Sequence, residues 1–582
     1  MPVPTNPDLP TSWELPGIYF SLNFAGQGGG IGTLDKRLLV LGYRLATGTQ
    51  PPDAPVRVNS VQDAWDYFGR GSDCARSIQA AIAQVGAGVI DLFACPLNEP
   101  AGGSAATHLI TVAGTATASG SLDIYVCGYL ASVPIASGDT ANIVAAAINA
   151  ELVKLADLPV TSGVATSTVT LTARHKGFQG NDLPVRVDQF GAPGLTFSPG
   201  TLVYSGTAVG VGSTTVTVSS TTISAAVANS DTATIIAAAI AAAINAGGYP
   251  VTASAATGTL TLFYRNGRYV HRIVGAMITS TGVTITPNVG VTPLNSGAER
   301  PSLTAALTTI AGQSAFSVWL SCFNEVTTLG TISTHIEVQG NGVNQKGQFV
   351  LAGQSQSLTT AGAIPAGTTP ALTASPRYGL VWCPESPQQE YELAARCGAM
   401  VAFEDYAPRN YDGKPLKTDA TVPLLLPHRA ARPSASDKNS AIHTYYMTPL
   451  AVDEVAGKLV VVSGKTTSNN ANLVLHDWGS IRHIDFMRAD FSSVLSTTFA
   501  GTNLRRYGVP NTPNTVTVTN IRDASYVEAV RLDAIDLYDG AETFKAAFTA
   551  EIDSVVPTRV NCFIPLAVIR SLHQIAPTGA PV

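Results

Sequence analysis

The chain repeats a segment of about 35 residues at an offset of about 91 residues. Residues 139–174 read DTANIVAAAINAELVKLADLPVTSGVATSTVTLTAR, and residues 231–265 read DTATIIAAAIAAAINAGGYPVTASAATGTLTLFYR. Each copy predicts an alanine-rich helix with apolar residues at helical spacing, followed by strands in which Thr alternates with apolar residues. We expect the carboxylates of Asp139 and Asp231 to cap the two helices.

The repeat predicts two small β-rich modules in tandem, over roughly 106–197 and 198–290. Neither copy carries paired carboxylates or clustered histidines, and His175 has no counterpart in the second copy, where residues 264–267 read YRNG. A module used twice for chemistry would repeat its reactive residues. We therefore expect the modules to decorate the outside of a larger body, where loops and insertions vary freely.

Outside the repeat, the sequence alternates between strands and helices. Continuous apolar runs over 36–43, 316–323 and 378–384 are typical of strands buried on both faces of a sheet. Helical patterns over 73–86 and 386–404 lie between them. The sequence predicts an α/β core that the modules interrupt.

Composition limits the class of protein. A chain of 582 residues exceeds what one hydrophobic core organises, and its charged fraction of 13% is about half the usual value. The net charge of -6 argues against direct nucleic-acid binding, no stretch is long and apolar enough for membrane insertion, and we expect no export signal. We expect all seven cysteines to be reduced: Cys74, Cys95, Cys127, Cys322, Cys383, Cys397 and Cys562.

Motifs for catalysis are missing from the sequence. The glycine run at 26–32 lacks the Lys-Ser/Thr pair of a phosphate loop, Ser72 is out of frame for a nucleophile elbow, and His476, Asp477 and His483 do not have metal-site spacing. We predict a protein that is not an enzyme and needs no cofactor or metal. A carbohydrate-cleaving pair of carboxylates stays open, because sequence alone does not locate such a pair.

Five stretches in order resemble Mu-like contractile-tail sheath proteins. AWDYFGRGSDCARSIQAAIAQVGAGVIDLFACPL at 64–97 resembles the N-terminal core of that family. The other four stretches are PGIYFSLNFAG at 16–26, VTLTARHKGFQGNDLPVRV at 169–187, PSLTAALTTIAGQSAFSVWLSCFNEVTTLGTI at 301–332 and DWGSIRHIDFMR at 477–488. The second repeat copy is the part that this resemblance explains least.

The resemblance implies an α/β (α+β) multidomain chain, with a sheath core, two inserted modules and extended N- and C-terminal arms. We divide it into an N-terminal arm and hinge (1–30), a first core part (31–105), module 1 (106–197), module 2 (198–290), a second core part (291–440) and a C-terminal domain with a terminal strand arm (441–582).

The resemblance also implies a structural function. Such subunits polymerise as stacked rings around a tail tube protein, and the helical assembly contracts to drive the tube through the host envelope for genome delivery. Baseplate and tail terminator proteins are the further partners, and the protein is expected in the virion tail after assembly in the host cytoplasm. A sheath of a bacteriocin or secretion machine remains an alternative, as does a β-rich adhesin or glycan-binding protein.

Sheath families hold subunits together with strand arms, and two segments of this chain suit that role. Ile18, Phe20, Leu22 and Phe24 alternate with Tyr19, Ser21 and Asn23, and flexible glycines follow them. The C-terminal candidate lies within 558–572 and includes Val560, Phe563 and Ile564.

The family also uses a C-terminal helix to contact the tube. The best match here is DGAETFKAAFTAEIDSV at 539–555, with an apolar face of Phe544, Ala547, Phe548 and Ile552. We expect its opposite side to contact the tube through Glu542, Lys545, Glu551 and Asp553.

Overall fold

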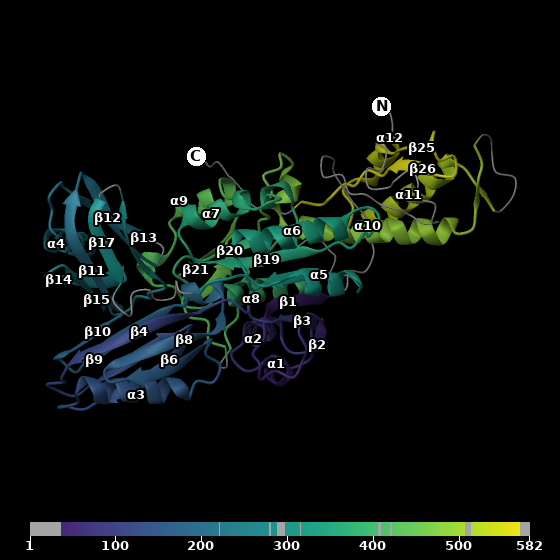
Figure 1. The fold of residues 1–582 in the computed structure, drawn as a ribbon. Coiled ribbons are helices and arrows are strands. Elements are labelled where there is room, and N and C mark those ends of the chain that lie inside the picture. Colours follow the sequence, from purple (N-terminus) through teal and green to yellow (C-terminus); the bar gives the residue numbers. More distant parts are fainter. Residues whose placement is uncertain are drawn as a thin grey trace, which may run out of the picture.

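The computed structural model describes residues 36–219, 221–278, 281–287, 297–314, 316–404, 409–419, 422–506 and 514–570. It has three parts along its length (Figure 1): β-rich modules at one end, a large α/β layer in the middle and a smaller C-terminal part at the other end. The predicted multidomain α/β class is confirmed.

The middle part contains an eight-stranded sheet in the order β2-β3-β1-β18-β19-β20-β21-β22. Neighbouring strands are parallel except at the two edges, where β2 and β22 are antiparallel to their partners. The strands are β1 Arg37–Tyr43, β2 Val56–Val58, β3 Asp91–Leu97, β18 Val318–Ser321, β19 Phe349–Gln354, β20 Tyr378–Trp382, β21 Thr448–Asp453 and β22 Lys458–Val461.

Helices cover both faces of this sheet, which explains its continuous apolar strands. Leu38 and Val40 of β1 pack into one hydrophobic cluster, while Leu39 and Leu41 pack into another on the opposite face. The first face is covered by α1 Val61–Phe68, α2 Asp73–Val85, α8 Glu390–Phe403 and α10 Trp478–Phe499. The second is covered by α5 Thr304–Ala311, α6 Val326–Gly340, α7 Leu358–Gly367 and α9 Ala435–His443.

The core strands and helices expected from the sequence are confirmed, with one shift at a helix start. β1, β18 and β20 lie within the predicted runs, and α2 matches the helix predicted over 73–86. The helix predicted from 386 begins at Glu390, since Gln389 before it has an extended backbone and occupies the N-cap. The sheet also includes β21 and β22, so it extends past residue 440, the predicted end of the second core part.

The two modules have the same topology. Module 1 has sheets β10-β4-β8-β7 and β6-β5-β9, and module 2 has β17-β11-β15-β14 and β13-β12-β16. Their helices occupy the same place in the order. Module 1 comprises β4 Ala105–Gly114, β5 Gly120–Val126, β6 Tyr129–Ile135, α3 Ala141–Val153, β7 Val160–Ala165, β8 Thr168–Lys176, a 3₁₀ helix Phe178–Asp182, β9 Val185–Gly191 and β10 Leu195–Ser198.

Module 2 repeats the elements of module 1 and also an isolated β-bridge between equivalent residues. Its elements are β11 Gly200–Val209, β12 Gly212–Val218, β13 Thr221–Val227, α4 Ala233–Ala246, β14 Val251–Ala256, β15 Thr259–Tyr264, β16 Ile273–Ile278 and β17 Thr281–Pro287. The bridge between Thr115 and Thr140 recurs between Thr207 and Thr232. The contacts therefore support duplication of a whole folding unit.

The predicted helix caps are wrong in detail. Thr140 and Thr232 occupy the N-cap positions, without a side-chain capping bond. The carboxylates of Asp139 and Asp231 instead accept hydrogen bonds from the amides of Ala136 and Ala228, each at 2.7 Å. A short Asp side chain can accept a hydrogen bond from an amide of the preceding turn as readily as from an amide of the helix, and here it accepts from the turn.

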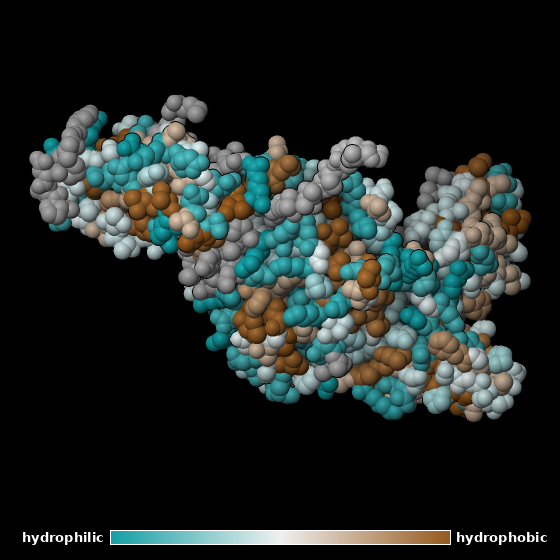
Figure 2. All heavy atoms as spheres, turned by 180° about the vertical axis from the view of Figure 1, so that it is seen from behind, coloured by the Kyte–Doolittle hydropathy of each residue, from teal (hydrophilic) through white to brown (hydrophobic). Residues whose placement is uncertain are grey.

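The larger part of module 2 has an almost uncharged sequence. Residues 199–264 contain one charged residue, Asp231. Thr234, Ile235, Ala238 and Ala242 of α4 are exposed. The module end, at the right of Figure 2, is mostly pale, which marks intermediate hydropathy rather than strongly polar or apolar surface.

A buried arginine joins module 1 to the core. The guanidinium of Arg76 on α2 pairs with Glu392 on α8, donates to the carbonyl of Asp157 and lies 5.3 Å from the ring centroid of Tyr129. Burial acts to lower the pKa of Arg76, but Glu392 together with Tyr391, Tyr129 and Cys127 outweighs it, so the pKa rises above its ordinary value. Nearby, Arg70 donates to both carboxylate oxygens of Asp157, at 2.7 and 2.9 Å.

Module 2 contacts both module 1 and the core. Val270 forms a bridge with Val185, and the side chain of Asn266 exchanges hydrogen bonds with the backbone of Gln189. Arg268 pairs with Glu385 of the core at 3.1 Å. These contacts fix module 2 against the rest of the chain.

The two ends of the insertion lie side by side, since Ser104 and Ala298 form an antiparallel bridge. Replacing residues 105–297 with a Gly-Ser-Gly linker should therefore leave a folded core, in which Arg76 and Glu392 become hydrated together. We expect a soluble protein with a cooperative thermal transition and an α/β circular dichroism spectrum. Aggregation of this variant, or an unfolding transition without cooperativity, would contradict the view that the modules are inserted into a core that folds without them.

Candidate assembly surfaces

The C-terminal part is organised around Phe544, which is fully buried. Its elements are α11 Val518–Asp533, α12 Phe544–Ala547, β25 Thr549–Ile552, β26 Val560–Phe563 and the short strands β23 Asn503–Leu504 and β24 Thr515–Val516. The ring of Phe544 has four aromatic neighbours: Phe548 at 5.7 Å, Tyr526 at 6.1 Å, Phe491 at 6.3 Å and Tyr538 at 6.3 Å. Such pairs contribute about 0.5–1.5 kcal/mol each beyond burial, so the cluster holds α10, α11 and α12 together.

The helix predicted over 539–555 is wrong. The chain forms a 3₁₀ turn at Ala541–Thr543 and the short α12, and Phe548 is then extended. β25 follows and pairs antiparallel with β26. Thr549, Ile552 and the residues up to Val556 include several β-branched side chains, which favour a strand, and pairing with β26 satisfies the backbone.

The turn between these two strands depends on Asp553. Its carboxylate accepts from the amides of Val555 and Val556 at 2.8 and 2.9 Å, from Arg559 at 2.7 Å and from Asn561 at 3.0 Å. The hydrogen bonds from Val556, Asn561, Val555 and Arg559 lower the pKa of Asp553. Its side chain is only 5% exposed. Asp553 is therefore a structural residue of the turn, and its predicted role in a tube contact is corrected.

The other predicted contact residues are on the surface. Glu542, Lys545 and Glu551 are exposed, and the ammonium of Lys545 lies 4.2 Å from the ring centroid of Tyr526. Of the predicted apolar face, Phe544 and Phe548 are buried, Ile552 is half-buried and Ala547 is exposed. Without a continuous helix these side chains do not share one helical face.

The predicted arms have different outcomes. Ile18, Phe20, Leu22 and Phe24 lie outside the described residues. Val560 and Phe563 belong to β26, which pairs with β25 of the same chain, and Ile564 is buried in the core cluster. Within the described residues this sheet has two strands, so each has one edge without a strand partner.

Sequence reasoning missed this hairpin, although the sequence contains a signal for it. Two four-residue segments, TAEI and VNCF, flank a stretch that contains Asp553, Ser554 and Pro557. Turn residues between two short runs rich in strand formers indicate a hairpin.

A buried polar cluster lies between module 1 and α2. The Nδ1 atom of His175 lies 3.0 Å from Glu99 Oε1, and its Nε2 accepts from the amide of Asp73 at 3.3 Å. The ring contacts Tyr43 at 5.4 Å between centroids. Since both ring nitrogens have protein partners, the cluster serves to join module and core.

The histidines near residue 480 are also used structurally. His476 Nε2 lies 2.6 Å from the carbonyl of Asn470, and His483 Nε2 lies 3.2 Å from that of Leu537. Over the described ranges, no group of three or more metal-ligating side chains comes together, and no helix is both long and apolar enough to span a bilayer. All seven cysteines are free thiols, and six are buried, as expected.

Comparison with known proteins supports the resemblance seen in the sequence. Over 183 residues the chain is 32% identical to the Mu-like prophage FluMu tail sheath protein of Haemophilus influenzae. This match covers 31% of the chain and 37% of the relative, so the chain matches less than half of that protein's length. No protein-family model matches the chain.

Two solved structures match most of the chain with low TM-scores. The sheath tail protein of Desulfitobacterium hafniense has a TM-score of 0.39 at 12% identity, covering 92% of this chain and 94% of that chain. The sheath tail protein of Listeria innocua has a TM-score of 0.38 at 10% identity, covering 89% and 87%.

Removing the Asp553 carboxylate should loosen the hairpin. In Asp553→Ala, two amides, Arg559 and Asn561 lose a charged acceptor, and bonds of this kind contribute about 1.5–3 kcal/mol each when partly buried. We expect faster hydrogen exchange of the amides in 549–563 than in wild type, with exchange in the eight-stranded sheet unchanged. Equal exchange in the hairpin would show that the turn holds without this carboxylate.

The same residue predicts a pH dependence. Because folding lowers the pKa of Asp553, its stabilising contribution is complete above the unfolded pKa of about 3.9 and declines as the pH falls below it. Protection of the hairpin amides should therefore weaken below about pH 4 in wild type and not in Asp553→Ala.

Proposed function

We propose that this chain is the subunit of a phage contractile tail sheath, which polymerises around a tail tube and shortens to drive that tube through the host envelope. The observation that carries the proposal is the 32% identity over 183 residues to a prophage tail sheath protein. The ordered motifs from residue 16 to residue 488 support the same reading.

The function is mechanical and needs no catalytic step. In the polar cluster of His175 and Glu99, both ring nitrogens of the histidine are paired with other protein groups. The free energy for shortening is stored when subunits assemble into an extended state that is less stable than the contracted one.

Strand addition at the C-terminal hairpin is the proposed link between subunits. β25 and β26 each offer backbone groups along one edge, and an extended segment from a neighbour can pair there. The segment with alternating Ile18, Phe20, Leu22 and Phe24 is the proposed donor, and Val560 and Phe563 belong to the hairpin that accepts it. Repetition over stacked rings multiplies this modest contact into a stable helical lattice.

The tail tube protein is the proposed partner on the inner side, and baseplate and tail terminator proteins are the proposed partners at the two ends. Glu542 and Glu551 are exposed acidic side chains near the hairpin, which suits a reversible contact with a basic tube surface. We place the protein in the virion tail, after assembly in the host cytoplasm.

The arm can be tested by self-polymerisation. Phe20→Asp combined with Leu22→Asp places charge on the apolar side of the arm, so we expect the loss of hollow tubes in negative-stain electron microscopy. The variant should still fold, with the circular dichroism spectrum of wild type. The matched control, Tyr19→Ser with Asn23→Ser, changes the other side of the arm and should still form tubes. If the double Asp variant still forms tubes, the N-terminal arm is not the link between subunits.

The tube contact can be tested separately. Glu542→Lys with Glu551→Lys reverses two exposed charges, and we expect at least a ten-fold loss of binding to purified tail tubes in a sedimentation assay. Self-polymerisation should persist, because neither side chain is buried in the hairpin. Wild-type tube binding by this variant would remove these residues from the contact.

A further inference from the structure

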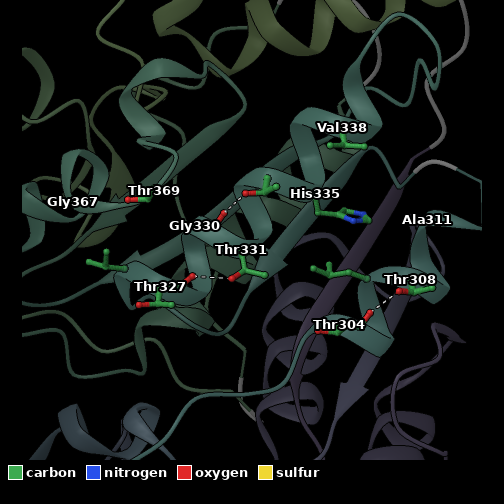
Figure 3. A pocket seen from close by; sticks show the side chains of 13 residues that line it. Thr304, Thr308, Ala311, Thr327, Gly330, Thr331, His335, Val338, Gly367 and Thr369 are labelled. Atoms are coloured by element: carbon green, nitrogen blue, oxygen red, sulfur yellow. Dashed lines mark hydrogen bonds between the residues drawn. The ribbon is translucent and has the colours of Figure 1, made fainter. Parts of the chain in front are cut away.

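An open groove of about 790 Å³ lies between α5 and α6. Thr304, Leu307, Thr308 and Ala311 line one wall, and α6 lines the other from Val326 to Val338. Figure 3 shows Gly367 and Thr369 at one end, and Ala311 and Val338 at the other.

The groove is less polar than its threonines suggest. The hydroxyls of Thr308, Thr331 and Thr334 donate to carbonyls four residues earlier in their own helices, at 2.8, 3.1 and 3.1 Å. Their hydrogen-bonding capacity is thus partly used within the helices, which leaves methyl groups for contact. None of the lining residues is Asp, Glu, Lys or Arg.

His335 adds an uncharged polar atom to the groove. Burial, with the nearby Lys346, lowers the pKa of His335 to about 4, so its ring is neutral at pH 7. Its side chain extends from α6 towards α5 (Figure 3), and its Nε2 is a buried atom without a hydrogen-bond partner in the described part of the chain. The groove therefore suits an uncharged, mainly apolar segment.

The N-terminal part of this chain contains such a segment. Residues 15–34 include no charged residue, and apolar side chains alternate from Ile18 to Phe24. Seven extended residues span about 23 Å at ~3.3 Å each, and the twelve helical steps from Val326 to Val338 span about 18 Å. The apolar segment and the groove are thus similar in length as well as in charge.

The end of the described chain also lies near the groove. Residue 36 directly precedes β1, whose Leu38 pairs with Val318 at the start of β18. α5 ends at Ala311, a few residues before β18, so the Ala311 end of the groove is at the end of the sheet where the parallel strands β1 and β18 begin. Residues 25–35 reach at most about 36 Å when extended, which allows the segment to return along the groove.

We propose that residues 18–24 bind in the α5–α6 groove of their own chain before assembly. The docked segment would cover its apolar side chains and keep the unassembled protein from uncontrolled strand pairing. Its role as a brake on polymerisation rests on the proposed sheath function, but docking itself does not. Assembly then exchanges this intramolecular site for the neighbour's hairpin.

Photo-cross-linking tests the occupant of the groove. A benzoylphenylalanine in place of Val338, which is 51% exposed, should cross-link to a peptide within residues 15–36. The product should have the mass of one chain, in dilute protein before polymerisation. The same group in place of Val455, which is 99% exposed in the turn between β21 and β22, is the positional control.

Arm variants provide the chemical control. Phe20→Ser with Leu22→Ser should lower the cross-link yield at least ten-fold, while Tyr19→Ser with Asn23→Ser should leave it unchanged. A cross-linked product of twice the chain mass would overturn the proposal in favour of a second copy. A yield no higher than at Val455 would overturn it outright.

A groove variant separates docking from the sheath function. Thr331 is exposed, so Thr331→Trp should fill the groove without unfolding the chain. We expect chymotrypsin to cleave at residues 19–24 at least ten-fold faster than in wild type, and tubes to form with a shorter lag. Unchanged cleavage would contradict docking. If wild type forms no tubes while the cross-link is present, the sheath proposal fails and the docking stands.

Discussion

The arrangement of the molecule depends on one buried charge, the guanidinium of Arg76. Both Arg76 and Glu392 are at most 2% exposed, and breaking a buried ion pair by removing one partner costs about 3–5 kcal/mol. The same guanidinium donates to the carbonyl of Asp157 in module 1. Arg76 thus links α2, α8 and module 1 at one buried point, alongside the contacts of Arg70 with Asp157 and of His175 with Glu99. Module 2 is placed in turn by module 1 and by Glu385.

Much of this fold could be predicted from local patterns in the sequence. The repeated segment indicated two like modules because duplicated residues make duplicated contacts, down to the bridges of Thr115 with Thr140 and of Thr207 with Thr232. The strands of the core were recognisable because helices on both faces of a parallel sheet require continuous apolar runs. These signals are strong since each depends on many residues at once.

The parts that sequence reasoning missed depend on contacts between distant residues. The run from 539 to 555 has helical spacing, yet Phe544 and Phe548 pack into an aromatic cluster with Phe491 and the chain then pairs with residues 560–563. The role of Asp553 follows from that pairing and from no local pattern, so a residue predicted at a contact surface is a turn residue instead. Likewise, no local pattern shows that β21 pairs with β20, because the two strands lie on opposite sides of the boundary predicted at residue 440.

The near absence of charge over residues 199–264, the larger part of module 2, affects how that surface responds to salt. Salt acts on proteins largely by screening fields between charged groups, over about 8 Å at physiological ionic strength. A stretch such as 199–264, whose one charged residue is Asp231, generates almost no field to screen. Contacts made by this surface should therefore change little with ionic strength up to physiological values, while the proposed contact through Glu542 and Glu551 at the other end should weaken over the same range.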